Sequence, residues 1–252
     1  MSSKSTLFVA NWKMNGTPSD LKEINKVADF LKKKFNKFLK IVIYCPPTPL
    51  LTYFSKKNLS NLIKFGAQNV SSTNIDYGAK TGSLSPKLLK QCGAEYVIIG
   101  HSERRLEGEN FSKIKKKINT SLNSNLKIIL CIGETFKQKK NNKSLAILKM
   151  QITKALSMHQ NLSNVIFAYE PIWSIGTGVV ADEAYLNKIF NFLNIFLKKK
   201  YKIRNPKILY GGSVNHSNIK NLRLINHCSG YLVGGASLKA KNFIEIIVNY
   251  YN

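Results

Sequence analysis

Polar side chains with established uses in proton transfer occur in three separate segments of the sequence. They are Asn11, Lys13, His101, Glu103 and Glu170. A carboxylate can remove a proton from the carbon next to a carbonyl group, and an imidazole and an ammonium group can stabilise the enediolate that forms. This reaction needs no cofactor. If the fold brings the segments together, they predict an enzyme that moves a proton within a small carbonyl compound.

Each of these residues also has a purely structural interpretation. Lys13 fits a solvated lysine, Glu170 fits a helix cap or a surface ion pair, and His101 fits a buried structural histidine. Glu103 precedes two arginines and fits a salt-bridge network. The chemical interpretation therefore depends on the fold placing all of them at one site.

Three glycine-containing segments favour such a site. Gly176-Thr177-Gly178, Gly211-Gly212-Ser213 and Gly234-Gly235 each follow an apolar run. Glycine lets the backbone approach a ligand closely, and exposed N–H groups there suit a phosphate. A single glycine loop is usually only a turn, but three in similar positions predict a phosphate site. The expected donors are Gly176, Ser213, Gly234 and Gly235.

The elements that must position these residues alternate along the chain. Eight short β-branched runs predict strands, with amphipathic helical patterns between them; the runs are 6–11, 40–45, 62–68, 94–100, 126–133, 164–170, 206–212 and 230–235. No linker or change of composition separates them. The pattern favours an α/β fold, a (β/α)₈ barrel, as a single domain over residues 1–252. A doubly wound open sheet is the alternative, but the first strand lacks the GxGxxG turn typical of dinucleotide-binding members of that fold.

Local signals mark some helix ends. Ser85-Pro86 is typical of an N-cap followed by a first-turn proline. Asp182 is expected to cap a helix that ends near Lys198, Lys199 and Lys200, whose charges suit the helix dipole. The buried face expected for that helix comprises Leu186, Ile189, Phe190, Leu193 and Leu197.

In a parallel barrel the carboxyl ends of all strands meet at one face, where catalytic residues of this fold lie. Each polar or glycine segment described above lies at the end of a predicted strand or directly after it. The sequence therefore predicts one site at that face. No cluster of His, Asp and Cys has the spacing of metal ligands, so no metal is expected, which argues against a metal-dependent epimerase.

Within the segment AYEPIWSIGTGVVAD (168–182), the residues that follow Glu170 are predicted to form a lid. Glu170 stands directly before it, and its base chemistry needs a site from which water is excluded. An apolar hinge is expected first, then a tip whose N–H at Gly176 reaches the phosphate, and then a second hinge from Gly178. The other residues of the predicted lid are Pro171, Ile172, Trp173, Ser174, Ile175 and Thr177.

The charge of the chain raises a second class of function. Lys and Arg number 39 against 13 Asp and Glu, a formal net charge of +26. Such an excess is typical of nucleic-acid binding. The lysines, however, lie in separate helical segments, without an arginine-rich recognition helix or an aromatic RNA-binding strand. We expect no nucleic-acid partner, and a solvated basic surface instead.

Other features predict a cytoplasmic protein. No apolar run approaches the roughly 18 residues that a membrane span needs, and the N-terminal residues do not resemble a signal peptide. Cys45, Cys92, Cys131 and Cys228 lack the spacing of a disulfide framework or a zinc site. We therefore expect no membrane partner and no disulfides.

Six motifs together resemble the triosephosphate isomerase family. They are ANWKMNG (10–16), VIIGHSERR (97–105), CIGE (131–134), AYEPIWSIGTG (168–178), YGGSV (210–214) and LVGGASL (232–238). The resemblance implies interconversion of dihydroxyacetone phosphate and D-glyceraldehyde 3-phosphate, in glycolysis and gluconeogenesis, without a cofactor. A class I aldolase is a further alternative, which borohydride trapping with substrate would reveal.

The resemblance also implies a role for each site residue. Glu170 matches the base, His101 the neutral electrophile and Lys13 the ammonium that offsets substrate charge. Asn11 matches a hydrogen-bonding neighbour, and Glu103 is expected to orient Lys13. The glycine and serine donors named above match the phosphate site.

The family further implies a homodimer in which a loop after strand three enters the partner. Thr81 matches the tip of that loop. Ser83 stands where the family has an acidic residue, so Arg104 is expected to lose a carboxylate from across the interface unless water or Glu134 replaces it. The segment after Arg105 is one residue short, and Ser229 replaces a common aspartate.

Overall fold

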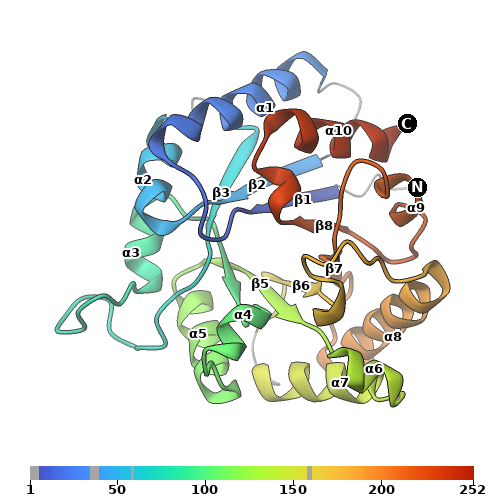
Figure 1. Ribbon diagram of the computed structural model, residues 1–252. Coiled ribbons are helices and arrows are strands. Elements are labelled where there is room, and N and C mark those ends of the chain that lie inside the picture. The colour runs from blue at the N-terminus through green and yellow to red at the C-terminus, as the bar shows by residue number, and fades with distance from the viewer. Residues whose placement is uncertain (1–5, 35–39, 58–59, 158–160) are drawn as a thin grey trace.

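Eight parallel strands form a closed barrel with neighbours in sequence order, in a computed structural model that describes residues 6–34, 40–57, 60–157 and 161–252 (Figure 1). The predicted (β/α)₈ barrel is confirmed, and the open doubly wound sheet is wrong. The strands are β1 (Thr6–Asn11), β2 (Lys40–Cys45), β3 (Ile63–Ala67), β4 (Tyr96–Ile99), β5 (Lys127–Ile132), β6 (Val165–Tyr169), β7 (Lys207–Tyr210) and β8 (Gly230–Val233).

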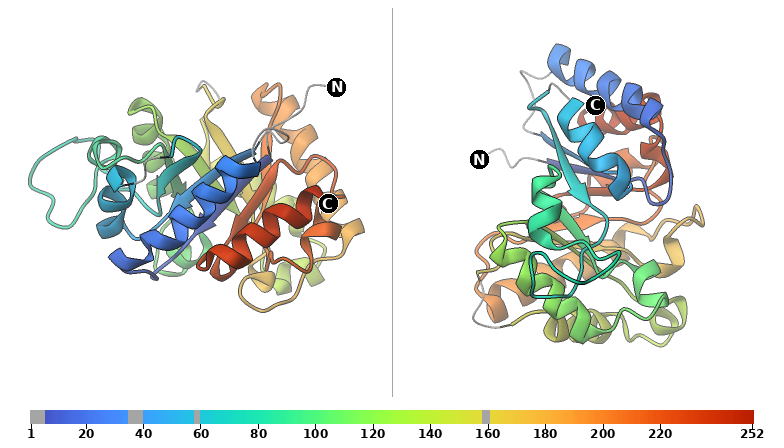
Figure 2. Two further views of the ribbon diagram at one scale, coloured as in Figure 1. Left: turned by 90° about the horizontal axis from the view of Figure 1, so that it is seen from above. Right: turned by 90° about the vertical axis from the view of Figure 1, so that its left-hand side faces the viewer.

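Helices surround the barrel on its outside (Figures 1 and 2). They are α1 (Leu21–Lys34), α2 (Thr48–Lys57), α3 (Pro86–Gln91), α4 (Ser102–Leu106), α5 (Phe111–Asn123), α6 (Phe136–Lys140), α7 (Ser144–Ala155), α8 (Glu183–Tyr201), α9 (Ile219–Leu222) and α10 (Ala240–Tyr251). Short 3₁₀ helices are η1 (Pro18–Asp20), η3 (Ile172–Ser174) and η4 (Gly235–Ser237). None of the described helices is long and apolar enough to span a membrane.

The predicted helix signals act as expected. The Ser85 side chain accepts a hydrogen bond from the N–H of Leu88 at the start of α3. Asp182 accepts one from the N–H of Tyr185 at 2.8 Å, which satisfies a free donor in the first turn of α8. The predicted apolar face of α8 is buried, and its last turn carries the three lysines.

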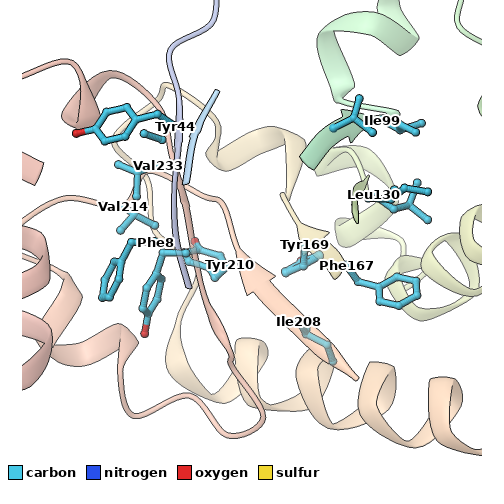
Figure 3. Close-up of a cluster of buried hydrophobic side chains, with 14 of the residues drawn as sticks. Phe8, Tyr44, Ile99, Leu130, Phe167, Tyr169, Ile208, Tyr210, Val214 and Val233 are labelled. Carbon is cyan, nitrogen blue, oxygen red and sulfur yellow. The ribbon is translucent and has the colours of Figure 1, made fainter. Parts of the chain in front are cut away.

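Strand alternation separates the core into two layers. In β1, Leu7 and Val9 belong to the apolar cluster inside the barrel, whereas Phe8 and Ala10 belong to the larger cluster between strands and helices. Figure 3 shows part of the outer cluster, with Phe8, Tyr210 and neighbouring side chains. Both layers are well buried, so the barrel is a rigid support for the residues at its rim.

One long connection departs from the compact arrangement. The segment between β3 and α3 projects from the side of the barrel (Figures 1 and 2). Residues 74–83 are exposed along it, and Thr81 is among them. The described residues of the chain leave 74–83 uncovered.

Candidate active site

A cavity of about 420 Å³ lies at the carboxyl ends of the strands. Its lining combines segments that follow β1, β6, β7 and β8. The predicted site residues that line it are Asn11, Lys13, Glu170, Ile175, Gly176, Gly178, Ser213, Gly234 and Gly235. A small phosphorylated molecule fits a cavity of this size.

Glu170 directly follows β6 and is only 5% exposed. Its backbone N–H donates to the carbonyl of Ile132 at 2.8 Å, which fixes the residue on the barrel wall. Two glycines make room for it. A Cβ on Gly133 would lie 1.8 Å from the Glu170 carbonyl oxygen, and one on Gly211 would lie 2.6 Å from its Cγ. The backbone therefore requires glycine at position 133, and glycine at position 211 leaves the space that the Glu170 side chain occupies.

His101 faces Glu170 from the end of β4. Its Nε2 lies 3.5 Å from Oε1 of Glu170. Among the described residues, His101 Nε2 and Glu170 Oε2 are buried atoms without a hydrogen-bond partner. Buried polar atoms are normally satisfied, so an unpaired donor and acceptor side by side indicate a place for a ligand.

The environment of His101 acts on its charge in opposite directions. Burial disfavours the imidazolium, but the carboxylates of Glu170 and Glu103 favour it more, and the pKa of His101 rises above its ordinary value of 6.5. Nδ1 accepts a hydrogen bond from the backbone N–H of Glu103 at 3.3 Å. This bond leaves the proton of the neutral ring on Nε2, which points toward Glu170.

Lys13 is held in an unusual backbone conformation at the end of β1. Its φ is +53°, and Asn11 Oδ1 accepts a hydrogen bond from its N–H at 3.2 Å. Its ammonium lies 2.6 Å from Oε1 of Glu103. The predicted pairing of Lys13 with Glu103 is thus present in the structure, with Asn11 as the local support of Lys13.

Gln68 is a supporting residue that sequence reasoning missed. Its Nε2 donates to the carbonyl oxygens of Lys13 and Cys45, each at 2.8 Å. It therefore ties the segments after β1 and β2 together beneath Lys13. A polar residue at the end of the third predicted strand was the only signal, and its partners depend on the barrel.

The lid is attached to the segment after β7. The N–H of Gly178 donates to Oγ of Ser213 at 3.2 Å, and the same hydroxyl donates to the carbonyl of Ser174 at 2.5 Å. Gly176 lines the cavity between these contacts. Thr177 Oγ1 donates to the carbonyl of Trp173 at 3.1 Å, so the lid also has internal support.

Trp173, at the first hinge, is bound to a buried carboxylate. Oε1 of Glu134, which is fully buried, accepts hydrogen bonds from Trp173 Nε1 at 2.9 Å, Tyr169 OH at 3.1 Å and Tyr185 OH at 2.9 Å. Sequence reasoning did not find this use of Glu134. Three donors from separate elements converge only in the folded chain.

Glu134, named as one possible replacement for the carboxylate that Arg104 is expected to lose, does not pair with Arg104 in the structure. Arg104 forms its ion pair with Glu107 of the same chain. Glu134 is occupied by the tryptophan and tyrosine donors instead. Arg104 Nε remains buried and without a hydrogen-bond partner within the described ranges.

The segment after Arg105, which the sequence analysis expects to be one residue short, forms a tight turn. Gly108 takes a φ of +87° after α4, and Glu109 then turns into the protein. Glu109 pairs there with the buried ammonium of Lys117, which also donates to Asn69 at 2.7 Å. The described residues contain no group of three or more His, Cys, Asp or Glu side chains arranged to hold a metal ion.

Comparison with known proteins assigns the chain to a family. The family model described as triosephosphate isomerase matches residues 6–250. Triosephosphate isomerase of Thermodesulfovibrio yellowstonii is 42% identical over 244 residues, which cover 95% of this chain and 97% of that protein. The protein of the same name from Buchnera aphidicola subsp. Schizaphis graminum is 42% identical over 252 residues, covering 97% of each chain.

Comparison with a solved structure supports the same family assignment. The crystal structure of triosephosphate isomerase from Bartonella henselae superimposes with a TM-score of 0.88 at 33% identity, covering 98% of this chain and 99% of that one. The similarity extends over all of the strands that carry the site. The chain belongs to the triosephosphate isomerase family.

Proposed function

We propose that Glu170 and His101 carry out the two halves of the isomerisation of dihydroxyacetone phosphate and D-glyceraldehyde 3-phosphate. The observation that carries this assignment is the pair of buried, unpartnered atoms, Glu170 Oε2 and His101 Nε2, beside the cavity. The Glu170 carboxylate removes a proton from the carbon next to the carbonyl. His101 donates its Nε2 proton in a hydrogen bond to the oxygen, where negative charge develops.

The charge changes during this step favour the neutral imidazole. In the free site the Glu170 carboxylate favours an imidazolium. Once Glu170 has taken the substrate proton, that carboxylate is neutral and its influence disappears. The hydrogen bond from the Glu103 N–H to Nδ1 then keeps the remaining ring proton on Nε2.

Lys13 supplies positive charge at the same place. Its side chain is about one third exposed, at 31%, and it lines the cavity. The ion pair with Glu103 orients the Lys13 ammonium without cancelling its positive charge, because Glu103 is itself half-exposed and screened by water. Asn11 is the hydrogen-bonding neighbour that supports this geometry.

The substrate phosphate binds at the opposite end of the cavity in this proposal. Backbone N–H groups of Gly176, Ser213, Gly234 and Gly235 are the donors, since all four residues line the cavity. Gly234 is the N-cap of η4 and Gly235 its first residue, and a Cβ built on either would meet no atom within 4 Å. The backbone there is open to a ligand.

The lid then excludes water. Its hydrogen bonds with Ser213, one of the proposed phosphate donors, support a lid that covers the phosphate end of the cavity. A docked lid strengthens the electrostatic interactions of Glu170 and prevents loss of phosphate from the enediolate. Pro171 and Ile172 at one hinge, and the residues after Gly178 at the other, are the proposed pivots.

We also infer a homodimer in the cytoplasm. The chain exposes Met14 at 96% and Leu106 at 84%, which lie one residue after Lys13 and at the end of α4. Ile75 and Tyr77 are exposed on the projecting segment that carries Thr81. Insertion of this segment beside the partner's Lys13 and His101 would cover apolar surface on both chains.

A coupled assay tests the proposed chemistry. Glyceraldehyde 3-phosphate is supplied, and dihydroxyacetone phosphate is detected by its reduction with NADH and glycerol phosphate dehydrogenase. Turnover without a bound cofactor supports the proposal. No turnover together with tight binding of duplex DNA at physiological salt would favour the basic-module alternative, and covalent trapping by borohydride would favour the aldolase.

A further inference from the structure

We propose that Lys139 is a positioning residue that keeps the lid docked, acting through the ring of Trp173. The inference rests on the proposed function, because it concerns the lid of the same site. It assigns a role to α6 and to Tyr185, neither of which touches the cavity lining.

The ammonium of Lys139 lies over two aromatic rings, those of Trp173 and Tyr185, and the ring of Phe136 also contacts Trp173. Lys139 Nζ lies 3.8 Å from the centroid of the Trp173 ring and 4.7 Å from that of Tyr185. The Trp173 ring meets Tyr185 with centroids 6.3 Å apart, and Phe136 at 6.5 Å, both in edge-on arrangements. The ammonium therefore occupies a partly aromatic cage, and cation–π attraction is strongest over tryptophan.

The cage and Glu134 fix the ring in two directions. The indole N–H points in the plane of the ring, and Glu134 accepts from it at 2.9 Å. The ammonium sits above the ring face, at right angles to that bond. Tyr185 contributes to both interactions: its ring lies under the Lys139 ammonium, and its OH donates to Glu134, the acceptor of the indole N–H. The same OH is bound to Ser144 Oγ at 2.8 Å. A hydrogen bond alone leaves the ring free to rotate about it, whereas the ammonium removes that freedom.

Trp173 is coupled to the tip of the lid by hydrogen bonds of its own carbonyl and of the next residue. Trp173 lies within η3, and its carbonyl accepts from Thr177 Oγ1. Ser174, the next residue, accepts the hydrogen bond of Ser213 through its carbonyl. Displacement of the tryptophan ring therefore disturbs the contacts that attach the lid to the segment after β7.

Lys139 differs from its neighbours on the same helix. It is half-buried, whereas Lys137 and Lys140 are exposed. The three lysines carry the same charge and lie within five residues of sequence. Replacing any one of them by a neutral residue is therefore expected to change the electrostatic field at the cavity by a similar amount. Lys140 thus provides a matched control in which charge is removed without loss of the ring contact.

Losing the contact between Lys139 and Trp173 is expected to change the share of the enediolate that loses phosphate instead of being protonated to product. With the lid docked, the intermediate is protonated to product; with the lid undocked, the bond between carbon and phosphate oxygen breaks, phosphate leaves with the electron pair, and methylglyoxal remains. Because phosphate leaves only while the lid is undocked, its release rises in proportion to the undocked population for as long as that form stays the minor one. A cation–π contact worth about 1 kcal/mol corresponds to about a fivefold change in that population.

The test compares Lys139→Met, Lys139→Arg, Tyr185→Phe and the control Lys140→Met with the wild-type chain. The readout is the ratio of inorganic phosphate released to triose phosphate isomerised, together with kcat and KM. We expect the ratio to rise about fivefold in Lys139→Met, to remain near the wild-type value in Lys139→Arg, and to be unchanged in Lys140→Met. Tyr185→Phe keeps the ring but loses the hydroxyl, so a smaller rise is expected.

Thermal melts separate a positioning role from a general loss of structure. Lys139→Gln, which keeps a polar side chain of similar length, serves as a second variant if Lys139→Met melts early. An unchanged ratio in both variants, with an active wild type, overturns the inference and leaves the proposed function intact. An equal rise in Lys140→Met also overturns it, because the effect would then be one of charge. A wild-type chain without isomerase activity would contradict the proposed function instead.

Discussion

Oε1 of Glu170 lies 3.5 Å from Nε2 of His101, and both side chains are buried at the carboxyl end of the barrel. The two residues follow β6 and β4, so neither neighbouring sequence nor a shared element brings them together. Their approach leaves a carboxylate oxygen and a ring nitrogen without partners in the described chain. A substrate with a carbonyl and an acidic C–H group supplies both missing partners.

Replacement of the base tests the role of Glu170 most directly. Glu170→Gln keeps the size of the side chain but removes the basic oxygen, so we expect kcat to fall about a thousandfold or more while the fold is retained. Circular dichroism and the coupled assay measure the two effects. Glu183→Gln, an exposed acid in the first turn of α8, is the control and is expected to retain full activity. A Glu170→Gln enzyme with a tenth of wild-type activity would remove Glu170 from this role.

The pKa of His101 measures the influence of its two carboxylate neighbours, Glu170 and Glu103. Burial opposes the charged ring but the carboxylates outweigh it, so the pKa in the folded chain lies above 6.5. Glu170→Gln removes one of these charges and is expected to lower the pKa of His101. Nuclear magnetic resonance of the ring proton in both chains measures this shift. An unchanged pKa would mean that Glu170 is not the main source of the increase.

The same shift has a consequence for stability with a definite sign. Because the folded pKa is raised, protonation of His101 stabilises the fold fully below the unfolded value near 6.5, and this contribution is lost as pH rises through the folded pKa. Relative to His101→Gln, the wild-type chain should therefore lose unfolding free energy over that window. Urea unfolding at several pH values measures the difference. An advantage that grows with pH would contradict the assignment.

Gly211 is expected to be essential for the position of the base. In Gly211→Ala the new Cβ would lie 2.6 Å from Cγ and 3.0 Å from Oε1 of Glu170, so the carboxylate must move. Displacement of a catalytic group by about 1 Å can cost on the order of a hundredfold in rate. We expect a loss of that size in kcat with a smaller change in KM. Full activity in a folded Gly211→Ala chain would show that Glu170 tolerates another position.

The proposed dimer should respond to salt in an unusual direction. Each chain has a formal charge of +26, so two chains repel, and added salt screens that repulsion. We expect the dimer dissociation constant to fall as salt rises, and Ser83→Glu to lower it further by restoring a carboxylate near Arg104. Sedimentation equilibrium at low and high salt measures both effects. A fully active monomer would contradict the proposal that Thr81 completes its partner's site.

Much of the fold follows from local patterns. A short, continuously apolar run such as TLFVAN predicts β1 between Thr6 and Asn11, because its successive side chains face two layers that are both buried. Asp182 and the apolar spacing after it set the start and the buried face of α8. These features depend on neighbouring residues, so they can be predicted without knowing the tertiary structure. The polar residues after the strands could be placed at one face because all strands of a parallel barrel run in the same direction.

The supporting contacts could not be predicted in this way. Gln68 reaches the carbonyls of Lys13 and Cys45, and Glu134 collects donors from three elements, because the barrel closes and brings distant segments together. Lys139 looks like any other lysine of this basic chain until α6 places it over the Trp173 ring. Sequence pattern specifies which residue types face the core and which follow the strands. The distances that decide hydrogen bonds and ring contacts arise only when the closed barrel fixes its helices and loops relative to one another.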